Sequence, residues 1–442
     1  MYSNKKILIL GMARSGYEAA KYLSKLNNEV IVTDAKEQDT EKVKELESLG
    51  VKVIITSNQI DLVTDDLDYM IKNPGIKYTN ECVLKANELG IKVINELELA
   101  YYFINKKAKI IGVTGSNGKT TTVTLIYNIL KESGLNAYLG GNIGTPLISF
   151  VDDIKENDIL VLEISDHQLC DMYDFKTDIS VLTNIYNEVH IDFHDSFERY
   201  QMMKKRIFNH HDNTSLAIIN KENKYSINLT NDIESNKLYF SLNDGDSYVK
   251  DNFIYYKDEK VVCLDDIKIK GNHNLENIMA TILVTKQFNV TNEDIKNVLN
   301  TFKGVEHRIE YVRTLNGVDY YNDSKSTNNK ATETALQSFR NPIILIMGGL
   351  NRNLPFDELS SFMSNVKEIV CYGETKEQIR KFADKNNIEC FIFDNLKEAA
   401  LKASNDAKCG DTVLLSPACA SWDQYKCFED RGNEFKDIIN SL

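Results

Sequence analysis

The sequence lacks an excess of positive charge, and it lacks long apolar runs. It contains 52 Lys and Arg against 65 Asp and Glu, which gives a net charge of −13. A surface that follows the phosphates of a nucleic acid needs clustered Lys and Arg, so we expect no nucleic-acid partner. The first apolar run, Ile7–Leu10, is too short for a membrane span or for the core of a signal peptide. We therefore also expect no insertion into a membrane.

Cysteines at metal-binding or redox spacing are missing as well. The eight cysteines are scattered, and none of them forms a C-x-x-C pair. This distribution is typical of reduced thiols in the cytoplasm, which is where we expect the protein to act. What the chain does have is length, because 442 residues predict about three domains of about 150 residues each.

A glycine-rich segment predicts a phosphate-binding loop. The apolar run Ala108–Gly112 before it is typical of a strand, and Val123–Leu130 after it has helical spacing. Between them lie the residues expected to bind nucleotide phosphates: Gly115, Ser116, Asn117, Gly118, Lys119, Thr120 and Thr121. Lys119 is placed for the β- and γ-phosphates and Thr120 for Mg²⁺, although the loop is a shortened T-G-x-x-G-K-T form of the usual pattern. The sequence therefore predicts binding of ATP or GTP.

The N-terminal segment has the layout of half a dinucleotide-binding domain. A predicted strand, Lys6–Leu10, leads into the glycine turn Gly11–Gly16, and a second strand, Glu29–Thr33, ends at Asp34. Such a turn places a helix N-terminus at a diphosphate, and the acidic residue can bind a ribose or a base. Ala13 replaces the middle glycine of the usual fingerprint, so NAD and another nucleotide diphosphate both remain open.

Two further segments carry candidate metal ligands. The apolar strand Asp158–Leu162 ends at Glu163, where a second metal contact is expected after a phosphate loop. His190, Asp192 and His194 alternate, and they would lie on one face if the segment were extended. These residues fit a Mg²⁺ site, a zinc site or a plain polar loop, and all three alternatives remain open.

The rest of the central segment is less informative. The helix expected at Phe197–Phe208 carries Lys204, which by itself indicates an ordinary solvated lysine. From Asn213 to Lys268 the chain is hydrophilic and alternating, which predicts a peripheral β region. Gly271–Asn277 begins a helix rich in amides, which could contact an adenine edge or only cap the helix.

The motifs and their order resemble the Mur ligase family. In chain order they are GVTGSNGKTTT, GGNIG, E-x-S-x-x-Q, N-I-x-x-x-x-H-x-D-x-H, K-x-R-I, G-x-H-N-x-x-N, H-R-I-E, N-D-S-K-x-T-N, G-G-L-x-R and L-L-S-P-A-C-A-S-W-D-Q-Y-x-x-F-E-x-R-G. They cover nearly the whole chain. The resemblance implies an α/β fold of three domains: a Rossmann-like parallel sheet that binds a UDP-sugar at 1–97, a central P-loop ATPase-type domain with a peripheral β region at 98–302, and a Rossmann-like amino-acid-binding domain at 303–442.

The last motif, Ser416–Gly432, resembles the members of the family that add D-glutamate. It implies a monomeric enzyme that uses ATP to ligate D-glutamate to UDP-N-acetylmuramoyl-L-alanine through an acyl phosphate, a cytoplasmic step of peptidoglycan precursor synthesis. Three alternatives remain: a relative that adds another amino acid, a folate-type polyglutamate ligase, and a nucleotide-binding regulatory protein that has lost ligation.

The resemblance also implies roles for single residues. It implies that the UDP-sugar peptide contacts Ser15, Asp34, Asn142, Ser165 and Gln168. It implies that D-glutamate contacts Lys325, Thr327, Arg352, Ser421 and Phe428. It places the adenine of ATP, and its ribose or phosphates, at Asn274, Asn277, Arg308 and Asp323.

Five residues are implied in metal binding and catalysis. Thr120, Glu163, His190 and Lys204 would hold Mg²⁺ at two sites, and Lys204 would do so as a carbamate formed with CO₂. Lys119 would neutralise the transferred phosphate and complete the catalytic set of Lys119, Glu163, His190 and Lys204.

The chain departs from the family pattern at three places. Ser165-Asp166-His167-Gln168 occupies the place where S-S-F-Q is common, which adds a charge and a titratable ring. The segment from Asn184 to His190 is one residue longer than expected, so His194 is an alternative metal ligand. Arg352 replaces a lysine of some relatives and offers a planar fork to a carboxylate.

Overall fold

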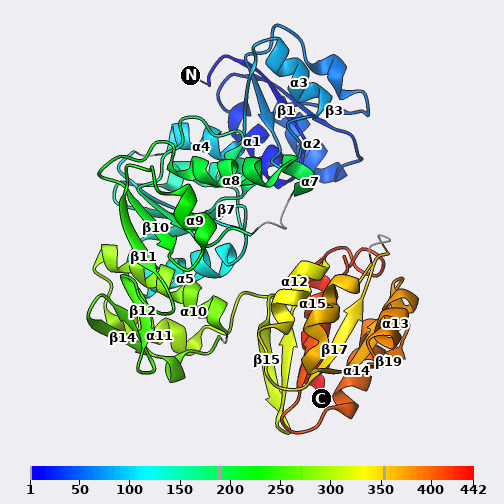
Figure 1. Ribbon diagram of the computed structural model, residues 1–442. Coiled ribbons are helices and arrows are strands. Elements are labelled where there is room, and N and C mark those ends of the chain that lie inside the picture. The colour runs from blue at the N-terminus through cyan, green and yellow to red at the C-terminus, as the bar shows by residue number, and fades with distance from the viewer. Residues whose placement is uncertain (1, 105, 187–190, 270, 352–354) are drawn as a thin grey trace. The chain divides into compact units, whose positions relative to one another are not determined.

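The chain folds into two compact units. The computed structural model describes residues 2–104, 106–186, 191–269, 271–351 and 355–442, apart from the side chains of residues 191, 192 and 330 (Figure 1). The first unit comprises Met1–Leu264 and Leu275–Val298, and the second comprises Asp265–Asn274 and Leu299–Leu442. Within the described residues the first unit contains two sheets and the second contains one.

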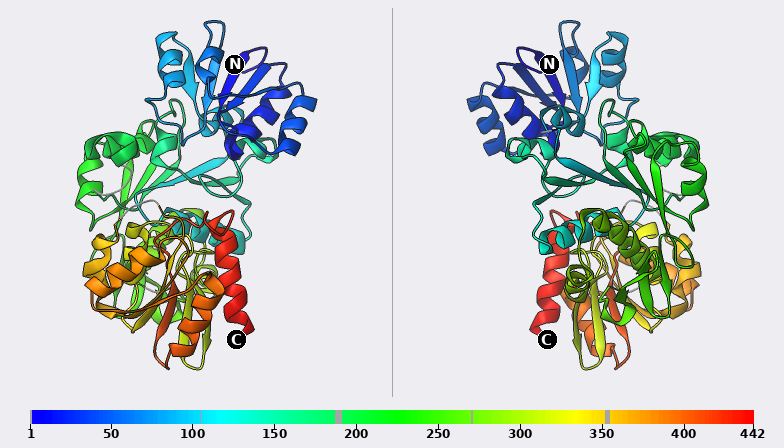
Figure 2. Two further views of the ribbon diagram at one scale, coloured as in Figure 1. Left: turned by 90° about the vertical axis from the view of Figure 1, so that its right-hand side faces the viewer. Right: turned by 90° about the vertical axis from the view of Figure 1, so that its left-hand side faces the viewer.

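The N-terminal sheet of the first unit is parallel and has helices on both faces (Figure 2). In the order β3-β2-β1-β4-β5, its strands are β1 (Lys6–Leu10), β2 (Glu29–Asp34), β3 (Lys52–Ile55), β4 (Tyr69–Lys72) and β5 (Lys92–Ile94). Its helices are α1 (Arg14–Ser24), α2 (Thr40–Ser48), α3 (Glu81–Glu88) and the 3-10 helix η1 (Gln59–Leu62). Alternate side chains of β1 enter different cores, because Ile7 packs with α1 whereas Leu8 packs with α3.

The central sheet contains the strand that leads into the phosphate loop and, at one edge, the strands of the peripheral β region. In the order β14-β13-β12-β11-β10-β9-β6-β8-β7, its strands are β6 (Lys109–Thr114), β7 (Ala137–Gly141), β8 (Ile159–Glu163), β9 (Ile179–Leu182), β10 (Leu216–Asn220), β11 (Asn236–Phe240), β12 (Ser247–Lys250), β13 (Phe253–Tyr256) and β14 (Glu259–Cys263). The described strand pairs of this sheet are parallel except for the two that β13 forms with β12 and β14. The peripheral β region expected at 213–268 is therefore present, as an extension of this sheet.

The helices of the central region surround this sheet. They are α4 (Glu96–Phe103), α5 (Lys119–Glu132), α6 (Asp166–Leu169), α7 (Ile191–His194), α8 (Phe197–Lys205), α9 (Lys224–Leu229), α10 (Asn272–Thr285) and α11 (Asn292–Thr301). The short 3-10 helices are η2 (Leu147–Ser149), η3 (Val151–Asp153), η4 (Arg206–Phe208), η5 (Leu264–Asp266) and η6 (Lys286–Phe288). The helical form of α7 contradicts the extended arrangement considered for the segment that ends at His194, so its alternate side chains do not share a strand face.

Buried polar contacts join the two sheets of the first unit through α4. The carboxylate of Glu96 is 3% exposed and accepts a hydrogen bond from the Ile148 amide at 2.7 Å. Burial raises the pKa of Glu96 to about 7. On the same helix, Glu98 accepts hydrogen bonds from the amides of Asp174 and Phe175 at 2.8 and 3.1 Å. These bonds link α4, which follows the last strand of the N-terminal sheet, to loops of the central sheet.

The second unit is a six-stranded sheet between helices. In the order β15-β16-β20-β17-β18-β19, its strands are β15 (Glu310–Leu315), β16 (Val318–Asn322), β17 (Ile343–Gly348), β18 (Val366–Tyr372), β19 (Glu389–Ile392) and β20 (Thr412–Leu415). The helices are α12 (Asn329–Leu336), α13 (Lys376–Lys385), α14 (Leu396–Asp406), α15 (Phe428–Ser441) and η7 (Asp357–Asn365). Leu345 packs on the α12 and α13 side and Ile346 on the α14 and α15 side, so β17 is buried on both faces.

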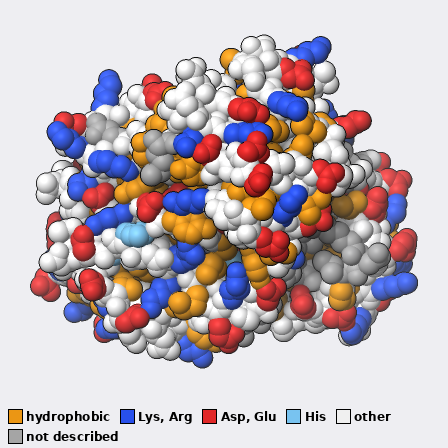
Figure 3. All heavy atoms as spheres, turned by 90° about the horizontal axis from the view of Figure 1, so that it is seen from above, with side chains coloured by type: hydrophobic (Ala, Val, Ile, Leu, Met, Phe, Trp, Pro, Cys, Tyr) orange, Lys and Arg blue, Asp and Glu red, His pale blue; other side chains and the backbone are white. Residues whose placement is uncertain are grey.

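The three sheets confirm the expected α/β class, in which parallel strands dominate. Among the described residues no helix combines the length and the apolar character needed to cross a membrane. On the face of the molecule shown in Figure 3, acidic and basic side chains lie among one another. Oppositely charged side chains form ion pairs at several positions of the described residues, for example Lys6 with Asp66 at 2.5 Å.

Candidate active site

The phosphate loop connects the end of β6 to the start of α5. Gly115 has φ of +146° and Gly118, which caps α5, has φ of +85°, so both adopt backbone conformations that L side chains rarely reach. A Cβ on Gly115 would overlap Thr183 Oγ1, and a Cβ on Gly118 would overlap Asn277 Oδ1. The two glycines therefore let the loop lie directly against distant parts of the chain.

The residues after β9 hold this loop in place. The Asn184 carbonyl accepts a hydrogen bond from the Ser116 amide at 2.8 Å, and its side-chain oxygen accepts one from the Asn117 amide at 2.9 Å. Thr183 donates to the Asn117 carbonyl at 2.6 Å. The sequence analysis did not identify Thr183 and Asn184 as site residues, although their position at the carboxyl end of a strand beside β6 was a usable signal.

The loop cation Lys119 and the strand-end carboxylate Glu163 lie at the same edge of the central sheet. Lys119 Nζ donates to the carbonyls of Gly115 and Ser116 at 2.8 and 3.0 Å, so its ammonium lies over the loop. The pairing of Val113 with Glu163 across β6 and β8 brings the Glu163 carboxylate to the same edge of the sheet. The loop region therefore contains both a cation and a carboxylate.

Glu163 links two other predicted residues. Its Oε2 accepts a hydrogen bond from the Thr120 hydroxyl at 2.7 Å, and its Oε1 accepts one from Asn142 Nδ2 at 2.8 Å. Glu163 is 2% exposed. A buried carboxylate bonded to the hydroxyl that follows the loop lysine offers oxygen ligands of the type that Mg²⁺ prefers. Thr120 and Glu163 therefore fit a Mg²⁺ ion beside the loop.

Lys204 is buried, which contradicts its interpretation as a solvated lysine. Its Nζ lies 3.0 Å from Asp166 Oδ1 and 3.3 Å from Thr114 Oγ1 at the end of β6. Burial opposes its charge, but the neighbouring Tyr200 and the Asp166 carboxylate outweigh burial and raise the pKa of Lys204. Tyr200 in turn forms a 2.7 Å hydrogen bond with Ser116, so α8 contacts the loop through Tyr200 and the end of β6 through Lys204. Tyr200 precedes Lys204 by four residues on one helix face, a signal that the sequence analysis missed.

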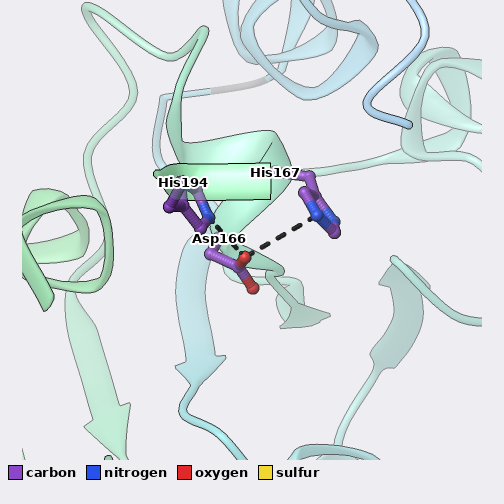
Figure 4. A group of neighbouring side chains, drawn as sticks. All are labelled: Asp166, His167 and His194. Atoms are coloured by element: carbon purple, nitrogen blue, oxygen red, sulfur yellow. Dashed lines mark hydrogen bonds and ion pairs between the residues drawn. The ribbon is translucent and has the colours of Figure 1, made fainter. Parts of the chain in front are cut away.

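Asp166 connects Lys204 to two histidines. His194 Nε2 lies 2.7 Å from Asp166 Oδ2, and His167 Nε2 lies 3.8 Å from the same oxygen (Figure 4). His194 is completely buried. The departure from the family pattern at Asp166 and His167 therefore lies directly beside Lys204. His190, the predicted metal ligand, falls outside the described residues, as does Arg352 in the second unit.

The N-terminal glycine turn is closed by Asp34. The carboxylate of Asp34 accepts hydrogen bonds from the Met12 and Lys36 amides at 2.9 and 3.0 Å. Gly16 faces the turn so closely that a Cβ there would overlap the Gly11 carbonyl oxygen. Ser15 is half-buried in the first turn of α1.

Ser165 and Gln168 form the capping box of α6. Ser165 Oγ accepts from the Gln168 amide at 3.3 Å, and Gln168 Oε1 accepts from the Ser165 amide at 3.0 Å. Both side chains are buried. In this state they stabilise the turn that carries Asp166 and His167.

The two amides predicted at adenine belong to different units. Asn277 lies in the first unit, where its Oδ1 is 3.4 Å from Thr122 Oγ1, a contact between residues 155 apart in the chain. Asn274 lies in the second unit, and its amide donates to the Gly271 carbonyl at 3.0 Å. Asn277 therefore packs against the phosphate loop.

In the second unit, predicted residues gather where β16 ends. Asp323 is 1% exposed, accepts from Ser416 Oγ at 2.7 Å and from the Ile309 amide at 3.2 Å, and burial raises its pKa to about 6. Lys325 Nζ lies 5.8 Å from the centre of the Phe428 ring.

The remaining predicted residues of the second unit lie in nearby segments. Ser421 is 2% exposed, Thr327 is half-buried, and Arg308 precedes the Ile309 amide that bonds Asp323.

Arg431 is a structural residue that the sequence analysis did not single out. It is completely buried, and its guanidinium donates to Ser324 Oγ and to the carbonyls of Ser324 and Cys419 at 2.9, 2.8 and 3.1 Å. These bonds join the last helix to the segment that carries Lys325. A buried guanidinium with its donors satisfied fixes this segment firmly.

These features define a class of protein. A strand, a glycine loop with Lys119 and Thr120, and a helix, beside a strand that ends in Glu163, form an α/β nucleotide-binding site for phosphoryl transfer. Family models match the chain as the Mur ligase MurD-like N-terminal domain at residues 5–95, the Mur ligase middle domain at 113–285 and the Mur ligase glutamate ligase domain at 307–419. The chain belongs to the Mur ligase family.

Its relatives and structural neighbours agree with this assignment. A UDP-N-acetylmuramoylalanine--D-glutamate ligase of Geobacillus sp. (strain WCH70) is 42% identical over 100% of this chain and 98% of its own length. The enzyme of the same name from Bacillus cereus (strain G9842) is 41% identical over 100% and 98%.

Solved structures of the family share the fold. UDP-N-acetylmuramate-alanine ligase MurC of Thermotoga maritima has a TM-score of 0.64 at 17% identity, with 99% of each chain covered. MurF of Acinetobacter baumannii has a TM-score of 0.60 at 14% identity, with 99% of this chain and 91% of that chain covered.

Proposed function

We propose that this protein is an ATP-dependent ligase that joins D-glutamate to UDP-N-acetylmuramoyl-L-alanine in the cytoplasmic synthesis of peptidoglycan precursors. The observation that carries the proposal is 42% identity over the whole chain to a ligase of that name. The hydrogen bonds of Glu163 to Thr120 and Asn142 beside the phosphate loop support the proposal, because a carboxylate and a hydroxyl at this place suit phosphoryl transfer.

The reaction has to make an amide from a carboxylate, which is a poor electrophile. The alanyl carboxylate attacks the γ-phosphorus of ATP, so that an acyl phosphate forms and ADP leaves. The neutral amine of D-glutamate then attacks the acyl carbon, the tetrahedral intermediate expels phosphate, and the amine gives up a proton. The contribution of the protein is to position these groups and to neutralise their charge.

The loop residues fit ATP and Mg²⁺. The glycines at 115 and 118 leave the backbone open to phosphate oxygens, and Lys119 already lies over the loop carbonyls, from which it can turn to the γ-phosphate. Mg²⁺ held by Thr120 and Glu163 would neutralise charge on the transferred phosphate. Asn277 packs against the loop and is proposed to contact adenine, with Asn274, Arg308 and Asp323 as further ATP contacts.

We assign a second Mg²⁺ to Glu163, His190 and Lys204, with Lys204 as a carbamate. Burial of Lys204 beside Thr114, at the strand that leads into the loop, supports this placement. A carbamate would supply two oxygen ligands at a position where an ammonium supplies none. Protein incubated with ¹³C-bicarbonate should then show a carbamate resonance that Lys204→Ala loses, and its absence in the wild type would refute the assignment.

The sugar-peptide residues are proposed on one edge of the first unit. Asp34 and Ser15 belong to the N-terminal turn, where amides and a helix N-terminus favour a diphosphate. Asn142 is bonded to Glu163, so a substrate carboxylate near Asn142 would lie close to the metal residues. Ser165 and Gln168 follow on α6.

The D-glutamate site is proposed in the second unit. Lys325 beside Phe428, together with Thr327, Ser421 and Arg352, would provide cations for two carboxylates and an apolar wall. We propose domains at 1–97, 98–302 and 303–442 for the UDP-sugar, ATP and the amino acid respectively, and we propose a monomer.

The test is phosphate release from ATP and Mg²⁺ with UDP-N-acetylmuramoyl-L-alanine and each candidate amino acid. Release that needs both the sugar nucleotide and D-glutamate, with a product heavier by one glutamyl unit, is the expected result. Release with L-lysine or L-alanine in place of D-glutamate would make the amino-acid pocket wrong. ATP binding without any ligated product would support the regulatory alternative instead.

A further inference from the structure

Two imidazoles converge on one carboxylate oxygen beside the phosphate loop region. Asp166 and His167 are adjacent on α6, and His194 is the last residue of α7 (Figure 4). One possible ligand atom from each of these residues lies within 4.8 Å of the other two. Both Nε2 atoms are directed toward Asp166 Oδ2, at 2.7 Å for His194 and 3.8 Å for His167.

The donor types select a class of metal ion. Two imidazole nitrogens and one carboxylate oxygen are ligands typical of Zn²⁺ and of neighbouring transition metals, whereas Mg²⁺ prefers oxygen ligands. The other oxygen of Asp166, Oδ1, already lies 3.0 Å from Lys204 Nζ, so Oδ2 is the oxygen that faces the two imidazoles.

The three side chains are held in place by their surroundings. The capping box of Ser165 and Gln168 fixes the turn that carries Asp166 and His167. His194 is completely buried, and its ring centroid lies 5.7 Å from that of Tyr200 and 5.9 Å from that of His167. The His167 side chain is 22% exposed, so the cluster is accessible from its side. Little side-chain freedom would be lost on binding.

Hydrogen bonding within the protein leaves His194 incomplete. Its Nδ1 is buried and has no hydrogen-bond partner among the described residues. A buried polar atom without a partner is rare in a native structure and calls for an explanation such as a bound ion or water. We propose that Asp166, His167 and His194 form a binding site for a divalent transition metal ion such as Zn²⁺, with ligands other than the proposed Mg²⁺ ligands Thr120, Glu163, His190 and Lys204.

In the experiment, a chelator first removes bound metal from the full-length protein, and the chelator is then removed. The metal-free protein is titrated with Co²⁺ in the presence of excess Mg²⁺. We expect visible absorption bands of the kind that Co²⁺ gives in a site of low coordination number. The bands should saturate at one equivalent of Co²⁺ and should disappear when Zn²⁺ is added. His167→Gln should weaken Zn²⁺ affinity by at least about tenfold, because loss of even an outer-shell partner of a ligand weakens metal binding about 10- to 100-fold. His210→Gln is the matched control, since it removes an exposed imidazole that contacts the Tyr173 carbonyl in the same unit.

His167 is the first choice for substitution because it is partly exposed, and thermal unfolding in chelator checks that the variant folds. Asp166→Asn is the second variant, because it keeps the shape of the side chain and removes its charge. Absence of a one-equivalent site would overturn the proposal, as would a sulfur-to-cobalt charge-transfer band, which would place the metal on cysteine. An equal loss of metal affinity in His210→Gln would place the ion elsewhere and overturn the proposal. A loss of metal affinity in Glu163→Gln but not in His167→Gln would overturn the proposal for the same reason.

Discussion

Two glycine turns in the first unit look alike in sequence and are held in different ways. Gly11–Gly16 and the phosphate loop each follow a buried parallel strand and each precede a helix. The first turn is closed by Asp34, at the end of the neighbouring strand, and by the contact of Gly16 with Gly11. The phosphate loop is held by Asn184 and Asn277, which are distant in the chain.

This difference teaches that a glycine motif can be specified locally or by the assembled fold. The backbone of the first turn is held mainly by β1, α1 and β2, while Gly11 also lies against Asn73 and the Arg14 side chain donates to the Gly144 carbonyl at 2.6 Å. The phosphate loop needs β9 and α10 in place, so its geometry depends on most of the central region. Substitutions can therefore separate the two turns.

The largest expected effect comes from Lys119→Ala. Removal of the ammonium should lower kcat for ligation by about 10²- to 10³-fold, the loss typical when one group that stabilises transition-state charge is deleted. Phosphate release under saturating substrates measures it. Lys131→Ala, which removes an exposed lysine from the last turn of the same helix, should retain activity. Equal activity of the two variants would contradict the role of Lys119.

The stability of the first unit should depend on pH through Glu96, which bonds α4 to the Ile148 amide. Its pKa rises from 4.5 to about 7 on folding, so folding favours the protonated acid. Its contribution is fully present below pH 4.5 and is lost as the pH rises toward 7, by about 3 kcal/mol in the free energy of unfolding. Urea unfolding across this range measures the loss. Glu96→Gln should flatten the profile, and Glu47→Gln, at an exposed site, should leave it as in the wild type. A profile unchanged by Glu96→Gln would refute the assignment.

Gly118→Ala tests the dependence of the phosphate loop on tertiary contacts. The added methyl group should destabilise the fold by about 1–3 kcal/mol, from an unfavourable φ and from overlap with Asn277 Oδ1. In combination with Asn277→Ala the overlap is relieved, so a double-mutant cycle in urea should give a coupling of about 1 kcal/mol.

Gly134→Ala is the matched control for that cycle. Its φ of +77° is similar, and nothing lies within 4 Å of the added methyl group, so it should show no coupling with Asn277→Ala. Equal coupling for both glycines would mean that Asn277 does not hold the loop.

The smallest expected effect concerns the first turn. Asp34→Ala removes the acceptor of the Met12 and Lys36 amides, which should cost about 1 kcal/mol of stability. If Asp34 also binds the UDP-sugar, the KM for that substrate should rise by about tenfold at unchanged kcat. Asp39→Ala removes a comparable pair of amide contacts at the start of α2 and should leave KM as it is. The same KM rise in both variants would exclude a direct role of Asp34.

Much of the fold and part of the site could be predicted from the sequence. The strand and helix patterns that flank Lys119 and Glu163 are local, and parallel strands bring their carboxyl ends to one edge, so the sequence could already indicate that these two residues lie at the same edge of a sheet. Lys204 was not predictable as a buried residue, because a lysine on a polar helix looks solvated until the neighbours of that helix are known.

What the sequence by itself determined is what depends on short-range order: the strand, loop and helix units, the buried apolar runs, the glycines at positive φ, and motifs sufficient to indicate the family. What only the tertiary structure decided is which polar groups meet inside the protein. Asp166 with Lys204 and His194, Asn184 with the phosphate loop, and the bonds of Arg431 each join segments far apart in the chain. Burial removes water from such groups, so their partners determine their charge and orientation, and a linear pattern does not specify those partners.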